Sequence, residues 1–292
     1  MFTGGSADMA EILKGAPAAA AITEDLTARA EALKAKGIVP TLAILRVGEN
    51  DSDLAYERGA EKRCEKVGIA VKKILLPAQC TQEELLRAVE SVNADDSVHG
   101  CLMFRPLPAH IDEALVSNAL CAKKDVDSMT AASLNTVFTG KGDGFAPCTA
   151  QACIEILDYY GIELKGANVA VIGRSLVIGK PVSMLLQARN ATVTMCHTKT
   201  VNMPEVCKRA DILVVAAGKA AMVDESYTNA KQIVVDVGIN VDAEGNLCGD
   251  VKFDAVEPCV AAITPVPGGV GSVTTAVLCK HVIEAAEKAN AV

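Results

Sequence analysis

The segment Val169–Pro181 combines residue types that suit an anionic nucleotide. The apolar run Val169–Ile172 is typical of a buried parallel strand, Gly173–Ser175 predicts a turn, and Gly179–Pro181 predicts the start of a helix. A strand that runs through a glycine turn into a helix presents unpaired backbone N–H groups and a positive dipole end, which suit a pyrophosphate. The glycine spacing differs from G-x-G-x-x-G, so a plain strand-to-helix turn is the alternative.

The end of the second strand indicates which dinucleotide is expected. A carboxylate at this place binds the free ribose hydroxyls of NAD, whereas its absence beside basic or hydroxyl groups suits the 2′-phosphate of NADP. The strand Ala191–Met195 is followed by His197–Thr200, which contains no carboxylate. Arg174 and Ser175 offer a guanidinium and a hydroxyl to phosphate oxygens. NADP is therefore favoured over NAD, against the alternative that Arg174 and Lys199 are only solvated surface charges.

Composition argues against several other classes of function. Half of the 292 residues are apolar, but Phe and Tyr number only five and four and Trp is absent, which favours an aliphatic core of parallel strands under helices. The net charge of −8 argues against a nucleic-acid partner. The eleven cysteines contain no C-x-x-C pair, so we expect thiols in a reducing cytosol rather than a metal site or disulfides. No signal sequence or membrane-spanning apolar run is visible, which predicts a soluble cytoplasmic protein.

Strands and helices are expected to alternate along the chain, which is typical of parallel sheets with right-handed crossovers. Residues 124–147 are rich in Gly, Asp, Ser and Thr and are expected to be an irregular, site-forming connection. Helices are expected at about 18–36, 52–67, 81–93, 111–120, 150–160, from Pro181 onward and at 273–289, and strands at 41–47, 71–76, 100–104, 169–172, 191–195, 212–217 and 233–238.

An ordered set of short motifs extends over nearly the whole chain, and the set is far more specific than any of its members. They are Val47–Asn50, Tyr56, Pro106–Pro108, Lys124–Asp127, Pro147–Thr149, Val171–Pro181, Ala191–His197, Asp236–Asn240, Gly249–Val251 and Thr264–Gly271. Together they resemble the methylenetetrahydrofolate dehydrogenase/methenyltetrahydrofolate cyclohydrolase family.

The resemblance implies an α/β protein of two domains with a cleft between them. The expected N-terminal domain, residues 1–147 completed by the helix 273–292, would bind the folate substrate and carry catalysis. The expected C-terminal domain, residues 148–272, would be a Rossmann-type parallel sheet that binds NADP. The resemblance also implies a homodimer.

The resemblance assigns roles to individual residues. Tyr56 would stack on or orient the folate, and Asp127 would accept hydrogen bonds from the pterin, whose amino and ring N–H groups suit a carboxylate. A loop-capping role for Asp127 is the alternative. The expected cleft lining is Pro267, Gly268 and Gly269, and the expected contacts to the dinucleotide are Gly173, Arg174, Ser175, Thr198 and Ile239.

The chain departs from the family pattern at two positions that matter for hydrolysis. The family has a lysine four residues after the tyrosine and a glutamine just before Leu-Pro-Leu-Pro. Here Ala60 and Phe104 occupy these places. Arg58 and Lys62 face away from Tyr56 on a helix, Arg63 lies about 10 Å along its axis, and Arg105 is expected to face away from Phe104.

Three hypotheses follow from this pattern. The leading one is an NADP-dependent methylenetetrahydrofolate dehydrogenase in one-carbon metabolism whose cyclohydrolase activity is weak or lost. Hydride transfer needs orientation, whereas hydrolysis needs an activated water and proton movements. A second hypothesis keeps both activities through a different base. A third is a non-catalytic nucleotide-binding regulatory protein, which would not need a pterin pocket.

Overall fold

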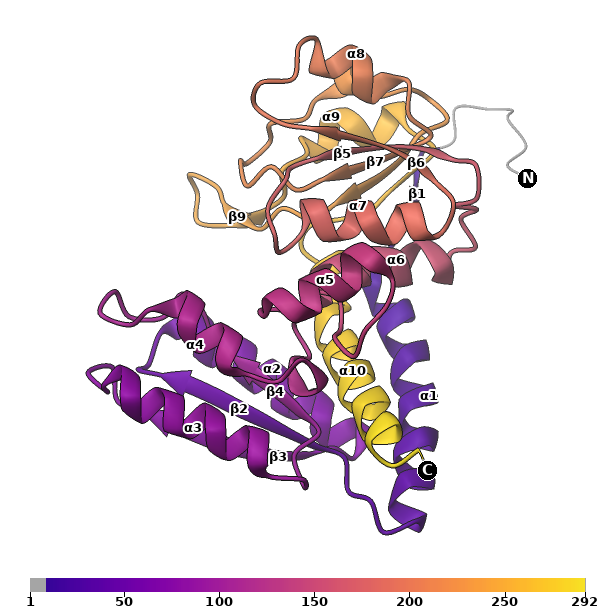
Figure 1. Ribbon diagram of the computed structural model, residues 1–292. Coiled ribbons are helices and arrows are strands. Elements are labelled where there is room, and N and C mark those ends of the chain that lie inside the picture. The colour runs from indigo at the N-terminus through magenta and orange to yellow at the C-terminus, as the bar shows by residue number, and fades with distance from the viewer. Residues whose placement is uncertain (1–8, 292) are drawn as a thin grey trace. The chain divides into compact units, whose positions relative to one another are not determined.

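The described residues, 9–291 of a computed structural model, form two units that each contain a parallel sheet (Figure 1). Residues up to Ala18 and Thr149–Val273 form the first unit, and Ala19–Cys148 with the chain from Thr274 onward form the second. The segment up to Ala18, expected in the N-terminal domain, belongs to the first unit because β1 (Glu11–Ile12) pairs with β11 (Ala262–Ile263).

The first unit is built on a six-stranded sheet whose strand pairs are all parallel, in the order β1-β11-β8-β7-β5-β6. Figure 1 shows α7 on one face of this sheet and α8 and α9 on the other. Because every strand points the same way, the loops after the strands share one edge of the sheet. The remaining elements are β5 (Asn168–Ile172), β6 (Thr192–Cys196), β7 (Ile212–Val215), β8 (Ile233–Asp236), the hairpin β9 (Asn240–Val241) and β10 (Leu247–Cys248), α6 (Cys148–Tyr159), α7 (Gly179–Ala188), α8 (Met203–Lys208) and α9 (Phe253–Val256).

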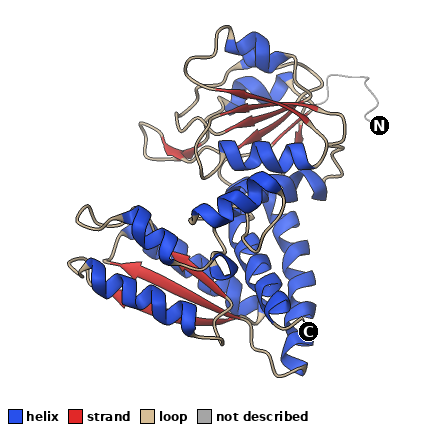
Figure 2. Ribbon diagram, in the orientation of Figure 1, coloured by secondary structure: helices blue, strands red, loops and turns tan. Residues whose placement is uncertain are grey.

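The second unit is built on a three-stranded parallel sheet in the order β3-β2-β4. Helices α3 and α4 pack on one face of this sheet, where Leu85, Val89 and Val116 join the buried side chains of β2 and β4 (Figure 2). The strands are β2 (Thr41–Val47), β3 (Ala70–Leu76) and β4 (Gly100–Met103), and the helices are α1 (Gly15–Ala35, which begins in the first unit), α2 (Asp51–Val67), α3 (Gln82–Ala94), α4 (Glu113–Ala119), α5 (Ala131–Thr139) and α10 (Thr274–Ala289).

Several elements match the sequence-based expectations and one does not. The strand expected at 41–47 is β2, and Thr81 and Glu84 form the predicted capping box of α3. The prediction that 124–147 is irregular is wrong, because α5 lies within it, capped by the Thr130 hydroxyl and ended by Gly140 in the left-handed conformation. Among residues 9–291, every helix is too short or too polar to cross a bilayer.

A buried ion pair fixes helix α2 on the sheet of the second unit. The Arg46 Nε of β2 lies 2.8 Å from the Glu57 Oε2, and both side chains are only 5% exposed. The Lys73 Nζ of β3 lies 2.9 Å from the Glu57 Oε1 and also pairs with Glu61. Burial acts to raise the pKa of Glu57, but the hydrogen bonds from Lys73 and Arg46 outweigh it and the pKa is lowered. The carboxylate of Glu57 therefore stays charged and holds α2 in one rotational orientation.

Replacing Glu57 with Gln is expected to reduce the free energy of unfolding of the second unit by roughly 3 kcal/mol, because the Arg46 guanidinium would stay buried without its counter-charge. Urea titration followed by circular dichroism measures this loss. Glu65→Gln, on an exposed position of the same helix, is the matched control and should change stability by no more than about 0.5 kcal/mol. Equal losses in the two variants would contradict the anchoring role of Glu57.

Candidate active site

The predicted turn after β5 is present, and close packing requires glycine at both of its ends. Gly173 has a φ of 126°, and a Cβ there would overlap the carbonyl oxygen of Ala216 after β7. A Cβ on Gly179, the first residue of α7, would overlap the carbonyl of Gly173. Between them Arg174 and Ser175 are exposed, and the Ser175 hydroxyl accepts from the Ile178 N–H at 3.1 Å. The turn therefore brings backbone close to solvent at a helix N-terminus, which fits a dinucleotide phosphate.

The loop after β6 lies beside this turn. Ile172 and Cys196 are paired residues of parallel β5 and β6, so the loops that follow them emerge next to each other. A tight turn forms there, in which the His197 N–H donates to the Thr200 hydroxyl at 2.9 Å and Thr198 is exposed. The edge carries Arg174, Ser175 and Thr198 without a carboxylate on the β6 loop, which fits a 2′-phosphate better than free ribose hydroxyls.

A cavity of about 200 Å³ lies at the same edge of the first unit, beyond β7. Its lining brings together Ile239, which follows β8, and Pro267, Gly268 and Gly269, which follow β11. Ile239 is 69% exposed. One predicted dinucleotide contact, Ile239, and the three residues predicted to line the cleft therefore share one cavity.

Two buried carboxylates build the loops around this cavity. Asp236 accepts from the N–H groups of Gly238, Asp250 and Val251 at 3.0, 3.1 and 2.9 Å. Asp250 accepts from the Ala217, Gly218 and Lys219 N–H groups at 2.6, 2.8 and 2.8 Å and from the Asn240 amide at 2.9 Å. These contacts join the loops after β7 and β8 to the segment around Asp250.

Glycine is required where the two carboxylates approach the backbone. A Cβ on Gly238 would overlap the Asp250 carboxyl, and one on Gly249 would overlap that of Asp236. The motifs Asp236–Asn240 and Gly249–Val251 therefore place Ile239 by building its loop.

In the second unit, Tyr56 on α2 lies beside the residue that follows β4. The rings of Tyr56 and Phe104 meet edge to face, with centroids 6.1 Å apart and planes at 82°. Burial is the main reason that the pKa of Tyr56 is raised, with Cys148 and Asp127 adding to it, and a hydrogen bond with Thr274 acts the other way. The Tyr56 hydroxyl is therefore neutral and suited to hydrogen bonding.

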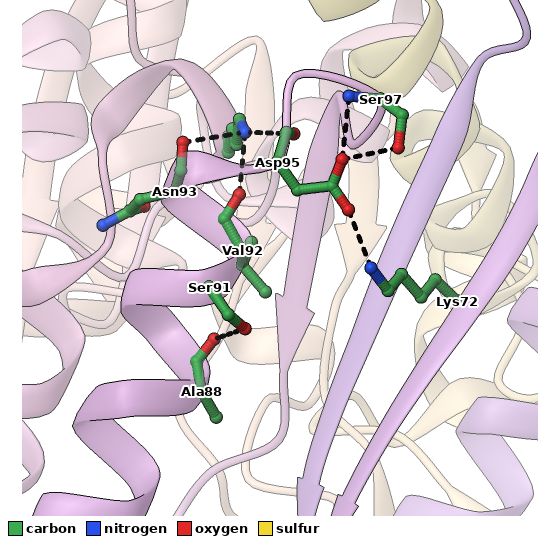
Figure 3. Close-up of polar contacts among 8 residues, drawn as sticks. Lys72, Ala88, Ser91, Val92, Asn93, Asp95 and Ser97 are labelled. Carbon is green, nitrogen blue, oxygen red and sulfur yellow. Dashed lines mark hydrogen bonds and ion pairs between the residues drawn. The ribbon is translucent and has the colours of Figure 1, made fainter.

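In the loop Lys124–Asp127, two charged residues hold the loop in shape and the third, Asp127, belongs to the candidate site. The Lys124 Nζ donates to the carbonyls of Val92, Asn93 and Asp95 at 2.7, 3.1 and 2.7 Å, which caps the C-terminus of α3. Figure 3 shows these carbonyls converging on one nitrogen. Buried Asp125 accepts from the N–H groups of Met129 and Thr130 at 2.9 and 2.8 Å. Lys124 and Asp125 thus hold the loop that presents Asp127.

Asp127 is partly buried and held by the start of α6. Its Oδ1 accepts from the Cys148 N–H at 2.9 Å, and the Cys148 thiol donates to the Val126 carbonyl at 3.3 Å. Burial raises the pKa of Asp127, while the Cys148 hydrogen bonds and the positive charge of Arg105 act to lower it. Tyr56 and Asp127 interact electrostatically, so the two predicted folate residues of this unit belong to one neighbourhood.

Comparison with known proteins agrees with this arrangement. Residues 13–127 match the model of the catalytic domain of tetrahydrofolate dehydrogenase/cyclohydrolase, and residues 147–290 match the NAD(P)-binding domain of the same enzymes. The chain belongs to the tetrahydrofolate dehydrogenase/cyclohydrolase family. The resemblance found in its motifs is therefore confirmed, as is the expected α/β class with a Rossmann-type sheet.

Relatives in this family align with the chain over nearly their full length. The "Bifunctional protein FolD" of Carboxydothermus hydrogenoformans is 52% identical over 97% of this chain and 99% of its own. The crystal structure of FolD from Campylobacter jejuni has a TM-score of 0.91 at 37% identity, covering 95% of this chain and 98% of its own. The Trypanosoma brucei enzyme, solved with NADP and an inhibitor, has a TM-score of 0.89 at 32% identity, covering 96% and 98%. The predicted NADP cofactor agrees with the NAD(P)-binding domain and with the cofactor in that structure.

Three contributors to the site were not predicted from the sequence of this family member. Asp250 stood within a recognised motif, but its four donors are spread over separate loops. Cys148 also stood within a motif, and only the fold brings its N–H to Asp127. Arg105 was expected only to face away from Phe104, whereas its charge acts on Asp127.

The pH dependence of stability tests the carboxylate scaffold of the first unit. Burial is the main reason that the pKa of Asp236 is raised to about 6, against about 3.9 in an unfolded chain. Between these values the folded protein binds the extra proton, so its stability should fall by about 2 kcal/mol as the pH rises from about 4 to about 6.

Asp236→Asn should remove that fall, and chemical unfolding of the two proteins across this pH range measures it. Above about pH 7 the two stability curves should run parallel, because the Asp236 carboxyl is then ionised in both states. An unchanged slope between pH 4 and 6 in the variant would show that Asp236 does not carry this proton.

Proposed function

We propose that this chain oxidises 5,10-methylenetetrahydrofolate to 5,10-methenyltetrahydrofolate with NADP⁺ as hydride acceptor, and that its cyclohydrolase activity is weak or lost. The observation that carries the second part is the pair Ala60 and Phe104. The family's lysine and glutamine would stand at these places, and neither residue present can hold or move a proton.

The surroundings of Ala60 leave it as a packing residue. Tyr56, Ala60 and Cys64 are spaced by four and share one face of α2. Ala60 is 0% exposed, and the Cys64 Sγ lies 3.8 Å from the Cys279 Sγ of α10. The face of α2 that follows Tyr56 therefore packs against α10. None of the three residues on this face, Tyr56, Ala60 and Cys64, carries an amine.

Neighbouring cations are poor substitutes for the missing lysine. Arg63 donates to the Thr23 hydroxyl at 2.8 Å, away from Tyr56. Arg58 and Lys62 are exposed on α2. Arg105 carries a guanidinium, which stays protonated and cannot serve as a base.

Hydride transfer makes smaller demands, and the residues for it are present. NADP⁺ supplies the hydride acceptor, and the product cation is stabilised by its own two nitrogens. In this proposal Asp127 binds the amino and ring N–H groups of the pterin, and Tyr56 orients the ring. Gly173, Arg174, Ser175, Thr198 and Ile239 bind the dinucleotide, while Pro267, Gly268 and Gly269 line the place where its reactive end lies. Orientation of this kind is worth several orders of magnitude in rate.

The bifunctional alternative is supported by the printed names of relatives such as that of Carboxydothermus hydrogenoformans. It requires a water-activating base other than the missing lysine. The homodimer and the cytoplasmic location implied by the resemblance stay predictions.

Purified protein should form NADPH from methylenetetrahydrofolate and NADP⁺, with lower activity on NAD⁺. The same protein added to methenyltetrahydrofolate should leave its near-ultraviolet absorbance decaying at the buffer rate, because Ala60 and Phe104 replace the family's lysine and glutamine. Heat-inactivated protein is the control. A decay rate that rises in proportion to active enzyme would establish the bifunctional alternative. NADP binding without folate binding in calorimetry would instead establish a regulatory protein.

Restoring the family pair should restore hydrolysis. Ala60→Lys alone is expected to hydrolyse methenyltetrahydrofolate little faster than the wild type, since Phe104 leaves the ammonium without a polar partner. Ala60→Lys with Phe104→Gln should hydrolyse methenyltetrahydrofolate about tenfold or more faster than that single variant, a gain within the range that general acid–base catalysis provides. Retained dehydrogenase activity shows that each variant folds.

Ala55→Lys with Phe104→Gln is the matched control, because it adds the same ammonium at an exposed position of α2. It should stay at the buffer rate. Full recovery in Ala60→Lys alone would show that the glutamine is dispensable in this chain.

A further inference from the structure

Arg105 is the second departure from the family at the end of β4. The pattern has glutamine followed by Leu-Pro-Leu-Pro, and this chain has Phe104-Arg105-Pro106-Leu107-Pro108. A guanidinium therefore replaces an apolar leucine, and the lysine ammonium of position 60 is replaced by a methyl group. The chain has lost a cation on α2 and gained one at the end of β4.

Backbone pairing places the loop that carries Asp127 against β4, the strand that Arg105 follows. Cys101 of β4 and Asp125 form an isolated parallel bridge, and the chain turns at Val126 and Asp127 directly after it. Asp127 lies two residues beyond this bridge and Arg105 lies just beyond the end of β4. The adjacent Phe104 already contacts Tyr56. Arg105 is partly buried and makes no hydrogen bond or ion pair with any of residues 9–291.

The groups around Asp127 leave Arg105 as its cation. Cys148 at the start of α6 donates its N–H, Tyr56 of α2 is neutral, and Asp125 of the same loop is a carboxyl that opposes ionisation. Burial also disfavours the carboxylate. A lysine at position 60 would have supplied a positive charge near Tyr56, and Ala60 supplies none.

We propose that Arg105 is a positioning residue that keeps the Asp127 carboxylate ionised, so that it can accept both N–H groups of the pterin. This inference rests on the proposed folate site. A protonated carboxyl would offer one acceptor and one donor to two donors, which weakens binding. Arg105 thus supplies the positive charge that the missing lysine would have supplied. Unlike a lysine, it cannot give up a proton and act as a base.

The test compares the wild type with Arg105→Leu, which introduces the family's own residue, and Arg105→Lys, which keeps the charge. The KM for methylenetetrahydrofolate and kcat are measured from about pH 5 to about pH 8. In Arg105→Leu the acidic limb of the pH profile of kcat/KM, where kcat/KM falls as the pH is lowered, should lie about one pH unit higher. The shift should come from a rise in KM, with kcat unchanged. Arg105→Lys should keep the wild-type limb, and the KM for NADP⁺ should be unchanged throughout.

Arg58→Leu is the matched control, since it removes an exposed guanidinium from the same unit. It should behave as the wild type. A limb that does not move in Arg105→Leu overturns the proposal. A KM raised equally at every pH also overturns it, because Arg105 would then contact the folate directly.

Infrared difference titration gives a readout that does not depend on turnover. A protonated carboxyl band, assigned by its absence in Asp127→Asn, should appear at higher pH in Arg105→Leu than in the wild type. The same midpoint in both proteins would refute the inference even if the enzyme is fully active. Failure of the wild type to oxidise methylenetetrahydrofolate would refute the proposed function while this band still decides the role of Arg105.

Discussion

The candidate folate site depends on the buried contact between Arg46 and Glu57. Taking both charges out of water is costly, so the pair persists only with good geometry and additional partners. Glu57 meets these conditions because it contacts both Arg46 and Lys73, from two neighbouring strands. Tyr56 precedes Glu57 directly and Ala60 follows by three residues. Once Glu57 faces the sheet, the helix has no rotational freedom left, and the direction of Tyr56 is set.

In the first unit, the loops around the cavity are held in place by carboxylates that bind backbone N–H groups instead of charged side chains. Asp236 and Asp250 together accept from six backbone N–H groups, which is how loops without regular structure keep a defined shape. The glycines at 238 and 249 leave room for these carboxyls. The motif residues Asp236, Gly238, Gly249 and Asp250 therefore hold the loops in shape, and these loops expose Ile239 to solvent.

How far the fold could be predicted depends on the range of the interactions. Val169–Ile172 and the capping box of Thr81 are local signals, and both were found. Helix α5 also has local signals, Thr130 and Gly140, but a surrounding stretch rich in Ser, Thr and Gly concealed them. The two-residue strands β1 and β11 could not be predicted, because Glu11 and Ala262 have no local pattern and the strands are ordered by pairing with each other and, for β11, with β8.

The chemistry of the site was also predictable only where it depends on the residue itself and not on its surroundings. Residue type alone identified Ala60 and Phe104 as unable to move a proton, since that property belongs to the side chain itself. Whether a charge matters depends on what surrounds it. Lys124 is charged but occupied by three carbonyls, whereas Arg105 is charged and its field reaches Asp127. A fixed cation can hold a carboxylate ionised, but it cannot take a proton from water. In the proposed function, the exchange of a lysine for an arginine at a different place therefore keeps the binding of a pterin and gives up the activation of water.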